Sequence, residues 1–217
     1  HDRTAVGADR FANAVAARAL YGTPAIVVDL GTATTFDCIS QQGAYLGGAI
    51  APGLATSAEE LFRRAARLPR VELRRPVRAL GRTTEESLQA GVLWGAAGQV
   101  DALVRRLALE MKGTPTVIAT GGLAATVAPE CETINRVDET LTLKGLRLIH
   151  ESVAHPETLA AWVKKQESRR SARAKSVARI EHEPVALFDD EPAPEIDDDD
   201  VIVVTGPEPG ERRGRDD

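Results

Sequence analysis

The sequence predicts an α/β domain followed by an acidic tail. The chain has 217 residues, of which 43% are hydrophobic and 4% aromatic, and most of its apolar mass is Ala, Val and Leu. Short apolar runs rich in β-branched residues end in glycine, and they alternate with longer stretches of helical periodicity. Such runs are typical of strands buried on both faces of a sheet. The length allows one large domain or two small ones.

The first elements are expected in a simple order. Residues 9–21 have the spacing of a helix. Three strands over 25–30, 34–40 and 45–50 follow, with a turn at 41–43, and together they predict a β-meander. The strand over 25–30 is expected to be buried on both faces because it is an apolar, β-branched run.

A second group of elements follows the break at Pro52-Gly53. Ser57 with Glu60 three residues later predicts a capping box that opens a helix ending at Arg67. Apolar spacing predicts the remaining elements: a long helix over 85–106 preceded by Thr84, a strand over 116–120, a short helix over 123–127 and a helix over 141–151.

The composition changes at His155. Residues 155–217 hold 10 basic and 16 acidic residues, so the net charge of −5 belongs to this segment and the first 154 residues are nearly neutral. Repeated Pro and an acidic run at 197–200 predict disorder, because this composition buries too little apolar surface to offset the entropy of ordering. We therefore expect a folded domain over 1–154 and a charged tail over 155–217, a solvated extension rather than a partner-binding segment.

Composition argues against several classes of function. A near-neutral body gives no case for nucleic-acid binding, and the arginines between residues 63 and 82, without interleaved aromatics, predict a solvated face. The absence of long apolar runs and of a signal sequence argues against membrane spanning and secretion, and predicts a cytoplasmic protein. Cys38 and Cys131 are expected to be buried thiols, and the four scattered histidines argue against a zinc site or a His-centred triad.

The most informative local feature is the end of the strand over 25–30. Asp29 is followed there by Gly31, Thr32 and two more threonines. Phosphate oxygens need convergent donors and close backbone approach, which Gly and Thr supply, and a carboxylate such as Asp29 is a candidate cation ligand beside them. A plain hairpin whose threonines serve β propensity is the structural alternative.

Two further corners have weaker signals. Gly121-Gly122 follows the strand over 116–120 and would let a nucleotide lie against backbone, although such pairs are common at strand ends. Asp9 begins the first helix, where an isolated Asp usually acts as a cap. Beside Arg10, however, Asp9 offers an acceptor for a hydroxyl proton next to a cation that suits a carboxylate or phosphate.

Taken together, seven motifs resemble the type III pantothenate kinase family, and their order and spacing match along about residues 5–151. The motifs are Gly7-Ala8-Asp9-Arg10, Asp29 to Thr35, Tyr45 to Gly53, Leu68-Pro69-Arg70-Val71, Gly81 to Thr84, Gln89-Ala90-Gly91 and Ala119 to Ala124. The resemblance implies the C-terminal half of an actin-like, sugar-kinase-type ATPase domain of the ribonuclease H-like class. It also implies transfer of the ATP γ-phosphoryl group to pantothenate, the first step of coenzyme A synthesis.

The resemblance also implies individual roles. Asp9 matches the catalytic proton acceptor, and Asp29 matches the ligand of a monovalent cation, K⁺ or NH₄⁺, which acts beside Mg²⁺ bound with ATP. The implied pantothenate contacts are Gly7, Ala8, Asp9, Arg10 and Thr84, and the implied ATP contacts are Thr32, Gly121 and Gly122. Family members are dimers with the substrate site near the interface, so a homodimer is implied.

Two alternatives remain. A non-catalytic regulatory relative of the Bvg accessory factor type shares this fold, but such a protein has no physical need to keep Asp9, Asp29, Thr32 and Thr84 together. The second alternative is an α/β scaffold with an acidic interaction tail.

One motif of the resembled family is missing from the sequence. Family members begin with an apolar strand and an Asp-x-Gly-Asn-Thr loop that holds the ATP phosphates and magnesium, and this chain has no such motif. With His1 in first position, we expect a fragment of a longer protein that lacks the N-terminal phosphate-loop domain, with a degenerate gene product as the second explanation.

The missing loop generates a first prediction. The purified 217-residue chain should phosphorylate pantothenate at a rate near the no-enzyme background, because the groups that hold the ATP phosphates are absent. A coupled assay for ADP release measures this rate. Measurable pantothenate-dependent turnover would contradict the prediction.

Overall fold

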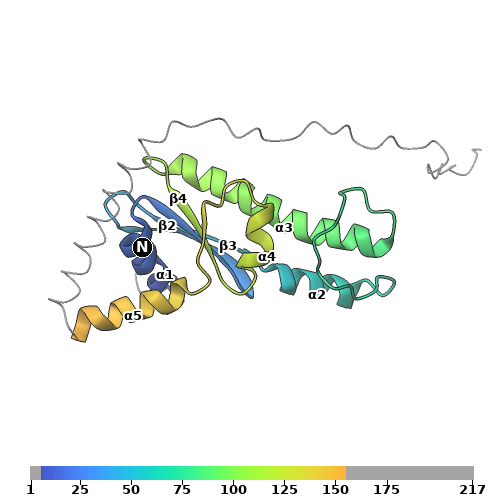
Figure 1. The fold of residues 1–217 in the computed structure, drawn as a ribbon, viewed down its shortest axis with the longest axis horizontal. Coiled ribbons are helices and arrows are strands. Elements are labelled where there is room, and N and C mark those ends of the chain that lie inside the picture. The colour runs from blue at the N-terminus through green and yellow to red at the C-terminus, as the bar shows by residue number, and fades with distance from the viewer. Residues whose placement is uncertain (1–5, 155–217) are drawn as a thin grey trace, which may run out of the picture. The chain divides into compact units, whose positions relative to one another are not determined.

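One mixed sheet of five strands organises the chain (Figure 1). The structure, a computed structural model, describes residues 6–154, which lie within the first of two compact units, residues 1–175. The strands are β1 (Ala25–Leu30), β2 (Ala33–Ile39), β3 (Tyr45–Pro52), β4 (Thr116–Thr120) and β5 (Arg136–Val137), in the order β3-β2-β1-β4-β5. Neighbours are antiparallel in β3-β2-β1 and parallel in β1-β4-β5. This order and these directions are those of a ribonuclease H-like α/β sheet, so the predicted α/β fold class and the meander are confirmed.

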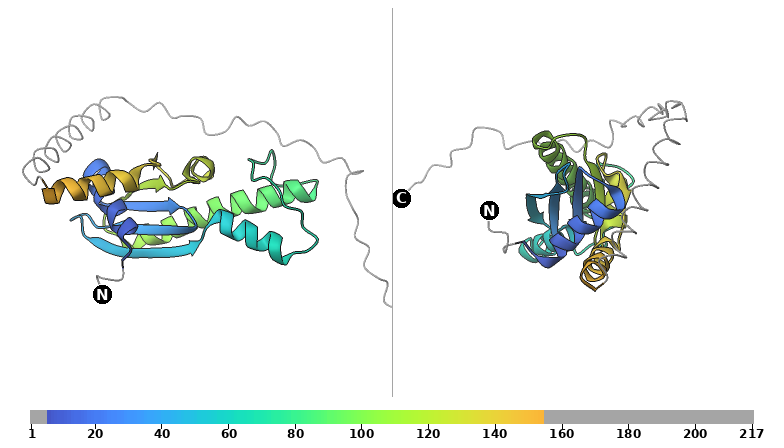
Figure 2. Two further views of the ribbon diagram at one scale, coloured as in Figure 1. Left: turned by 90° about the horizontal axis from the view of Figure 1, so that it is seen from below. Right: turned by 90° about the vertical axis from the view of Figure 1, so that its left-hand side faces the viewer.

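Helices cover both faces of the sheet (Figures 1 and 2). On one face α1 (Ala8–Tyr21) packs beside α5 (Leu141–Ala154). The other face is covered by α3 (Thr84–Glu110), together with α2 (Leu54–Arg64), α4 (Ala124–Val127) and the short 3₁₀ helix η2 (Ala128–Glu130). The central strands β1 and β4 are buried on both sides, which explains their continuous apolar runs.

Side-chain alternation along β1 assigns its residues to the two layers. Ile26, Val28 and Leu30 pack into the core on the α3 face, whereas Ala25 and Val27 pack against α1. The next position on the α1 face is Asp29, whose carboxylate accepts a hydrogen bond from an α1 side chain. The period of two therefore directs this carboxylate to the α1 side at the end of the strand.

Small residues let α1 and α5 approach closely. The buried residues of α1 are Ala12, Asn13, Ala14, Ala16 and Ala17. Gly145 of α5 faces the α1 backbone so closely that a Cβ there would lie 2.0 Å from the Ala12 carbonyl oxygen. The absence of a side chain at Gly145 thus determines the distance between the two helices.

The predicted start of the second helix is wrong. Helix α2 begins at Leu54 rather than Ser57 and ends at Arg64 rather than Arg67. Ser57 lies inside the helix, where its backbone N–H donates to the Gly53 carbonyl, and no capping box forms. The N-cap is Gly53, whose backbone N–H donates to the Thr32 carbonyl, and this tertiary contact has no local sequence signal.

The other boundaries differ by a few residues. Helix α3 extends from Thr84 to Glu110, and its N-cap is Thr83, whose Oγ1 accepts from the Glu86 backbone N–H at 3.1 Å. Thr84 is thus the first helical residue rather than the residue before the helix. Strand β5 was not predicted, because two residues are too short for a periodic pattern.

Three further predictions concern the two cysteines, membrane spanning and the C-terminal tail. Cys38 is buried as expected, whereas Cys131 is only partly buried. Within residues 6–154, no helix combines the length and apolar character needed to cross a membrane. The predicted disordered tail over 155–217 lies outside the described residues.

The close approach of α1 and α5 predicts the effect of a substitution. Gly145→Ala should lower the free energy of unfolding by about 1–3 kcal/mol, because the new Cβ overlaps backbone that cannot yield without moving a helix. Gly95→Ala in α3 is the matched control, since its Cβ would have no neighbour within 4 Å, and it should be neutral or slightly stabilising. Urea denaturation of both variants makes the comparison, and equal stability would contradict it.

Candidate active site

Polar groups converge at the carboxyl end of β1. The half-buried carboxylate of Asp29 accepts a hydrogen bond at Oδ2 from Asn13 Nδ2 of α1, 3.0 Å away. Burial raises the pKa of Asp29, the hydrogen bond from Asn13 lowers it in part, and the nearby charge of Asp9 raises it further. Two carboxylates from separate sequence motifs therefore lie close enough to interact electrostatically.

A hydrogen-bond chain orients Asn13. Thr142 Oγ1 of α5 donates to Asn13 Oδ1 at 2.7 Å, and Asn13 Nδ2 then faces Asp29. An amide has one accepting and one donating end, so using the oxygen for Thr142 directs the NH₂ group to the carboxylate. Asn13 is fully buried, and these two bonds satisfy it. No sequence pattern marks Asn13, because its partners lie 16 and 129 residues away.

Glycine allows the β4 corner to approach Asp29. Gly121 follows β4 with φ +90°, and a Cβ there would lie 2.5 Å from Asp29 Oδ1 and 2.8 Å from the Leu30 backbone. Neither the conformation nor the space tolerates a side chain. Thr120, which pairs with Asp29 in the β1–β4 register, is buried, and its Oγ1 forms no hydrogen bond with the described residues. Gly122 is exposed and has no heavy-atom neighbour within 4 Å of a Cβ position.

The turn between β1 and β2 carries Thr32. Its exposed side chain follows Asp29 by three residues. Its carbonyl oxygen accepts from the Gly53 backbone N–H at 3.2 Å and from Thr56 Oγ1 at 2.8 Å. The start of α2 therefore holds this turn, and the structure brings Thr32, Asp29 and Gly121 to the same edge of the sheet.

The segment Gly7 to Arg10 forms the first turn of α1 with Gly7 as N-cap. Asp9 is exposed, and its Oδ1 accepts from the Arg10 backbone N–H at 2.8 Å. A Cβ at Gly7 would lie 2.6 Å from the same oxygen, so glycine leaves room for the carboxylate. Ala8 and Gly7 are exposed beside it. Asp9 is thus accessible, with the positive end of a helix dipole behind it.

Arg10 points to the sheet instead of solvent. Its Nε donates to Asp37 Oδ1 of β2 at 2.7 Å, and its guanidinium lies 5.9 Å from the centre of the Tyr45 ring. Burial raises the pKa of Asp37, whereas the hydrogen bonds from Tyr45 and Arg10 lower it in part. Sequence analysis missed Asp37 and Tyr45 as site residues, because only the pairing of β2 with β3 and the docking of α1 bring them together.

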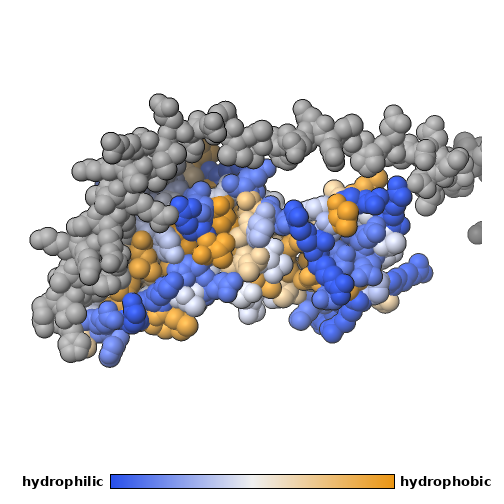
Figure 3. All heavy atoms as spheres, in the orientation of Figure 1, coloured by the Kyte–Doolittle hydropathy of each residue, from blue (hydrophilic) through white to orange (hydrophobic). Residues whose placement is uncertain are grey.

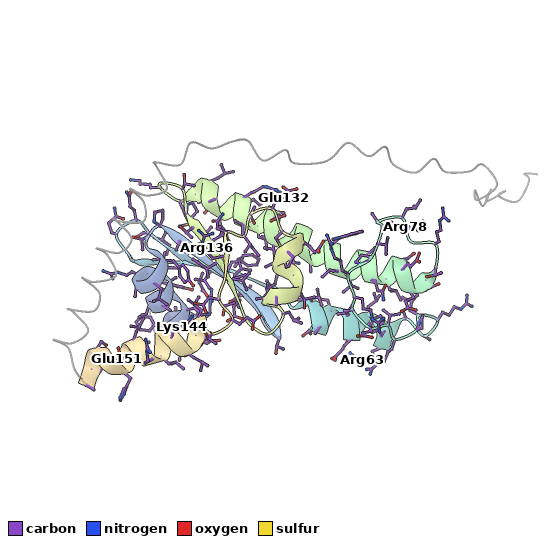
Figure 4. All side chains as sticks on the ribbon, in the orientation of Figure 1. Arg63, Arg78, Glu132, Arg136, Lys144 and Glu151 are labelled. Atoms are coloured by element: carbon purple, nitrogen blue, oxygen red, sulfur yellow. The ribbon has the colours of Figure 1, made fainter. Side chains whose placement is uncertain are left out.

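Thr84 is a predicted substrate contact that lies outside this cluster of residues. It opens α3, whose first turn lies at the end of the described region away from α1 in both ribbon views (Figures 1 and 2). Thr83, Glu85 and Glu86 there line a cavity of about 430 Å³ with Arg74, Arg75 and Arg78. Figure 4 shows Arg63 and Arg78 at this end and Lys144 and Glu151 at the other, on α5. Within one chain, Thr84 and Asp9 do not form one site.

The sequence comparisons point to one family. The pattern of the family described as type III pantothenate kinase matches residues 1–106. This part of the chain is similar to the type III pantothenate kinase family. The type III pantothenate kinase of Moorella thermoacetica is 57% identical over 146 residues, and that of Geobacter sulfurreducens is 55% identical over 146 residues. Each match covers 67% of this chain, and respectively 58% and 57% of the relative.

The chain therefore spans less than three fifths of the length of these type III pantothenate kinases. Among solved structures, a Campylobacter jejuni protein described as a candidate Baf family transcriptional activator is 25% identical with a TM-score of 0.48. That match covers 70% of this chain and 67% of the other. The activator of 2-hydroxyisocaproyl-CoA dehydratase from Clostridium difficile is 14% identical with a TM-score of 0.42, covering 77% and 69%.

The environment of Asp29 predicts a pH dependence. Because its pKa is raised above the usual 3.8, the folded state favours the protonated carboxyl, and the associated stability is present at low pH and is lost as the pH rises through the folded pKa. Asp29→Asn does not ionise, so its Tm relative to the parent should increase between about pH 4 and pH 7.

Thermal unfolding in a buffer with a bulky organic cation measures this difference, because no small cation then neutralises the carboxylate. Glu139→Gln, at an exposed site, is the control and should show no such trend. A Tm difference for Asp29→Asn that is constant with pH would contradict the interpretation.

Proposed function

We propose that residues 6–154 form the pantothenate-binding and cation-binding part of a type III pantothenate kinase, which transfers the γ-phosphoryl group of ATP to the primary hydroxyl of pantothenate. The single observation that carries this proposal is the convergence of Asp9, Asp29 and Gly121. These residues come from three separate motifs and meet at one end of the sheet. The similarity of residues 1–106 to the type III pantothenate kinase family supports this choice of reaction.

Asp9 suits the role of proton acceptor. It is exposed at the start of α1, so a substrate hydroxyl can reach its carboxylate. Phosphoryl transfer has a loose transition state in which the protein mainly positions groups and offsets charge. In this proposal Asp9 orients the hydroxyl and takes its proton, while Arg10 of the same turn binds the carboxylate of pantothenate.

Asp29 suits a monovalent cation such as K⁺ or NH₄⁺. Its neighbours Asn13 and Asp9 are an amide and a second carboxylate, and neither supplies positive charge. A bound cation would offset the cost of burying the Asp29 charge and would reduce repulsion between phosphate oxygens and the carboxylates. Mg²⁺ is proposed only as its ATP complex, because the described residues contain no group of three or more metal-ligating side chains.

ATP is proposed to lie along the edge formed by Thr32, Gly121 and Gly122. Thr32 presents an exposed hydroxyl, and the open space around Gly122 lets a ring or ribose approach the backbone. The reaction belongs to coenzyme A synthesis, and we place the protein in the cytoplasm with that pathway. Both assignments rest on the similarity of the matched region to that family.

A homodimer explains the position of Thr84. If Thr84 contacts pantothenate, a second copy must bring its own Thr84 to the Asp9 cluster, because the two lie apart within one chain. Apolar side chains are exposed at both ends of the described region, on α5 and on the loop before α3, where Figure 3 shows orange patches. These residues are Val77, Leu80, Leu143, Leu146 and Val153.

Substrate binding tests the proposal directly. Calorimetric titration of the full chain with pantothenate should show saturable binding, and Asp9→Ala should weaken it without lowering Tm, because Asp9 is exposed. Glu139→Ala is a control at an exposed site outside the cluster. Absence of pantothenate binding by the parent chain in the presence of K⁺ and ATP would refute the proposal.

The catalytic role of Asp9 gives a further prediction. In a complete enzyme, made by joining this chain to the unmatched part of the Moorella thermoacetica relative, Asp9→Ala should lower kcat by at least about a hundredfold, the lower end of general-base contributions. The KM for ATP should change little, because Asp9 faces the acceptor hydroxyl. Steady-state kinetics separates the two, and near-normal turnover would exclude Asp9 as the base.

A further inference from the structure

We propose that Asp37 is a positioning residue for substrate binding, which holds the Arg10 guanidinium where it receives the carboxylate of the acceptor substrate. The inference rests on the proposed function of the site and adds a residue that none of the sequence motifs assigned to it. Asp37 lies on β2, 27 residues from Arg10, and its side chain is 0% exposed.

Three contacts immobilise the arginine. Its Nε donates to Asp37 Oδ1 at 2.7 Å, its Nη2 donates to the Phe36 carbonyl at 3.5 Å, and its charge lies over the Tyr45 ring. An arginine has five N–H donors in a planar fork, so these bonds use one edge and leave donors for an incoming anion. The Arg10 side chain is 18% exposed, which keeps part of the guanidinium accessible.

Strand β3 leaves room for the contact between Arg10 and Asp37. Gly48 of β3 lies opposite Asp37 in the register and brings no side chain to this face, and a Cβ there would lie 1.6 Å from the Phe36 carbonyl oxygen. Beyond Gly48 the register shifts between Cys38 and Ile39, so that Tyr45 rather than Leu46 pairs with Ile39. The extra residue reverses the side-chain alternation and places Tyr45 on the face of Asp37.

Tyr45 then binds the same carboxylate oxygen as Arg10. Its hydroxyl donates to Asp37 Oδ1 at 2.8 Å, and its ring lies beneath the guanidinium. The second oxygen, Oδ2, is buried and forms no hydrogen bond within the described region. A buried carboxylate with an unpaired oxygen is costly and adds little net stability even when it is paired with arginine. A role in holding Arg10 explains why a carboxylate occupies this buried position.

The test compares two ligands that differ in charge. Pantothenate carries a carboxylate, and pantothenol has an uncharged alcohol in its place. Asp37→Ala should weaken the binding of pantothenate to the full chain about tenfold or more, the scale of a lost charge-assisted contact, and should change pantothenol affinity less than about twofold. Asp37→Asn keeps an acceptor oxygen and should bind pantothenate more tightly than Asp37→Ala does. It takes the place of the alanine variant in the comparison if that variant does not fold.

A double-variant cycle tests whether Asp37 acts through Arg10. Arg10→Gln should weaken pantothenate binding selectively, and adding Asp37→Ala to it should cause no further loss, because the interaction has already been removed. In ¹⁵N NMR spectra, the Arg10 Nε–H should exchange slowly with water in the parent chain and rapidly in Asp37→Ala.

The outcomes separate the two proposals. Equal loss for both ligands, no loss, or additive effects in the cycle would overturn the role of Asp37 while leaving the proposed function intact. A parent chain that binds neither ligand would refute the proposed function and the substrate role of Asp37 with it. Rapid exchange of the parent Arg10 Nε–H would overturn the positioning role whatever the affinities are.

Discussion

The buried amide of Asn13 connects the elements on which the site depends. It accepts from Thr142 of α5 and donates to Asp29 at the end of β1, so one side chain links two helices to the central strand. A buried amide is costly unless its polar atoms are paired, and these bonds require both helices to lie at one distance from the sheet. The alanines of α1 and Gly145 of α5 provide that distance.

This link determines the direction of each functional group on α1. With Asn13 held against Asp29, the preceding turn projects Asp9 into solvent and Arg10 toward β2. The first turn of α1 therefore presents an accessible carboxylate and a fixed cation side by side. The charge of Asp9 in this turn also acts on Asp29, which meets Gly121 at the end of β1. Positioning of charged groups is the main requirement of the phosphoryl transfer that we propose for this site, and backbone packing supplies that positioning.

Sequence patterns predicted the strands better than the helix ends. β1 and β4 were predicted at their observed limits, because a buried strand needs an unbroken apolar run that glycine ends. The start of α2 was misplaced because Ser57 and Glu60 have the local pattern of a capping box, whereas the Gly53 contact with Thr32 starts the helix earlier. Asn13 and Asp37 had no local signal, since their partners are distant in sequence or on other elements. Tyr45 begins one of the seven motifs, but its contact with Asp37 depends on the pairing of β2 with β3.

The sequence by itself determined the class of fold, the order of the main strands and helices, and the motifs that make Asp9, Asp29, Thr32 and Gly121 candidate site residues. These features depend on short-range periodicity and on residue chemistry, which a linear chain records directly. Only the tertiary structure decided that Asp9 and Asp29 interact, that Asp37 holds Arg10, and that Thr84 lies away from them in one chain. Such contacts arise from strand register and helix packing, which bring together residues that no local pattern relates.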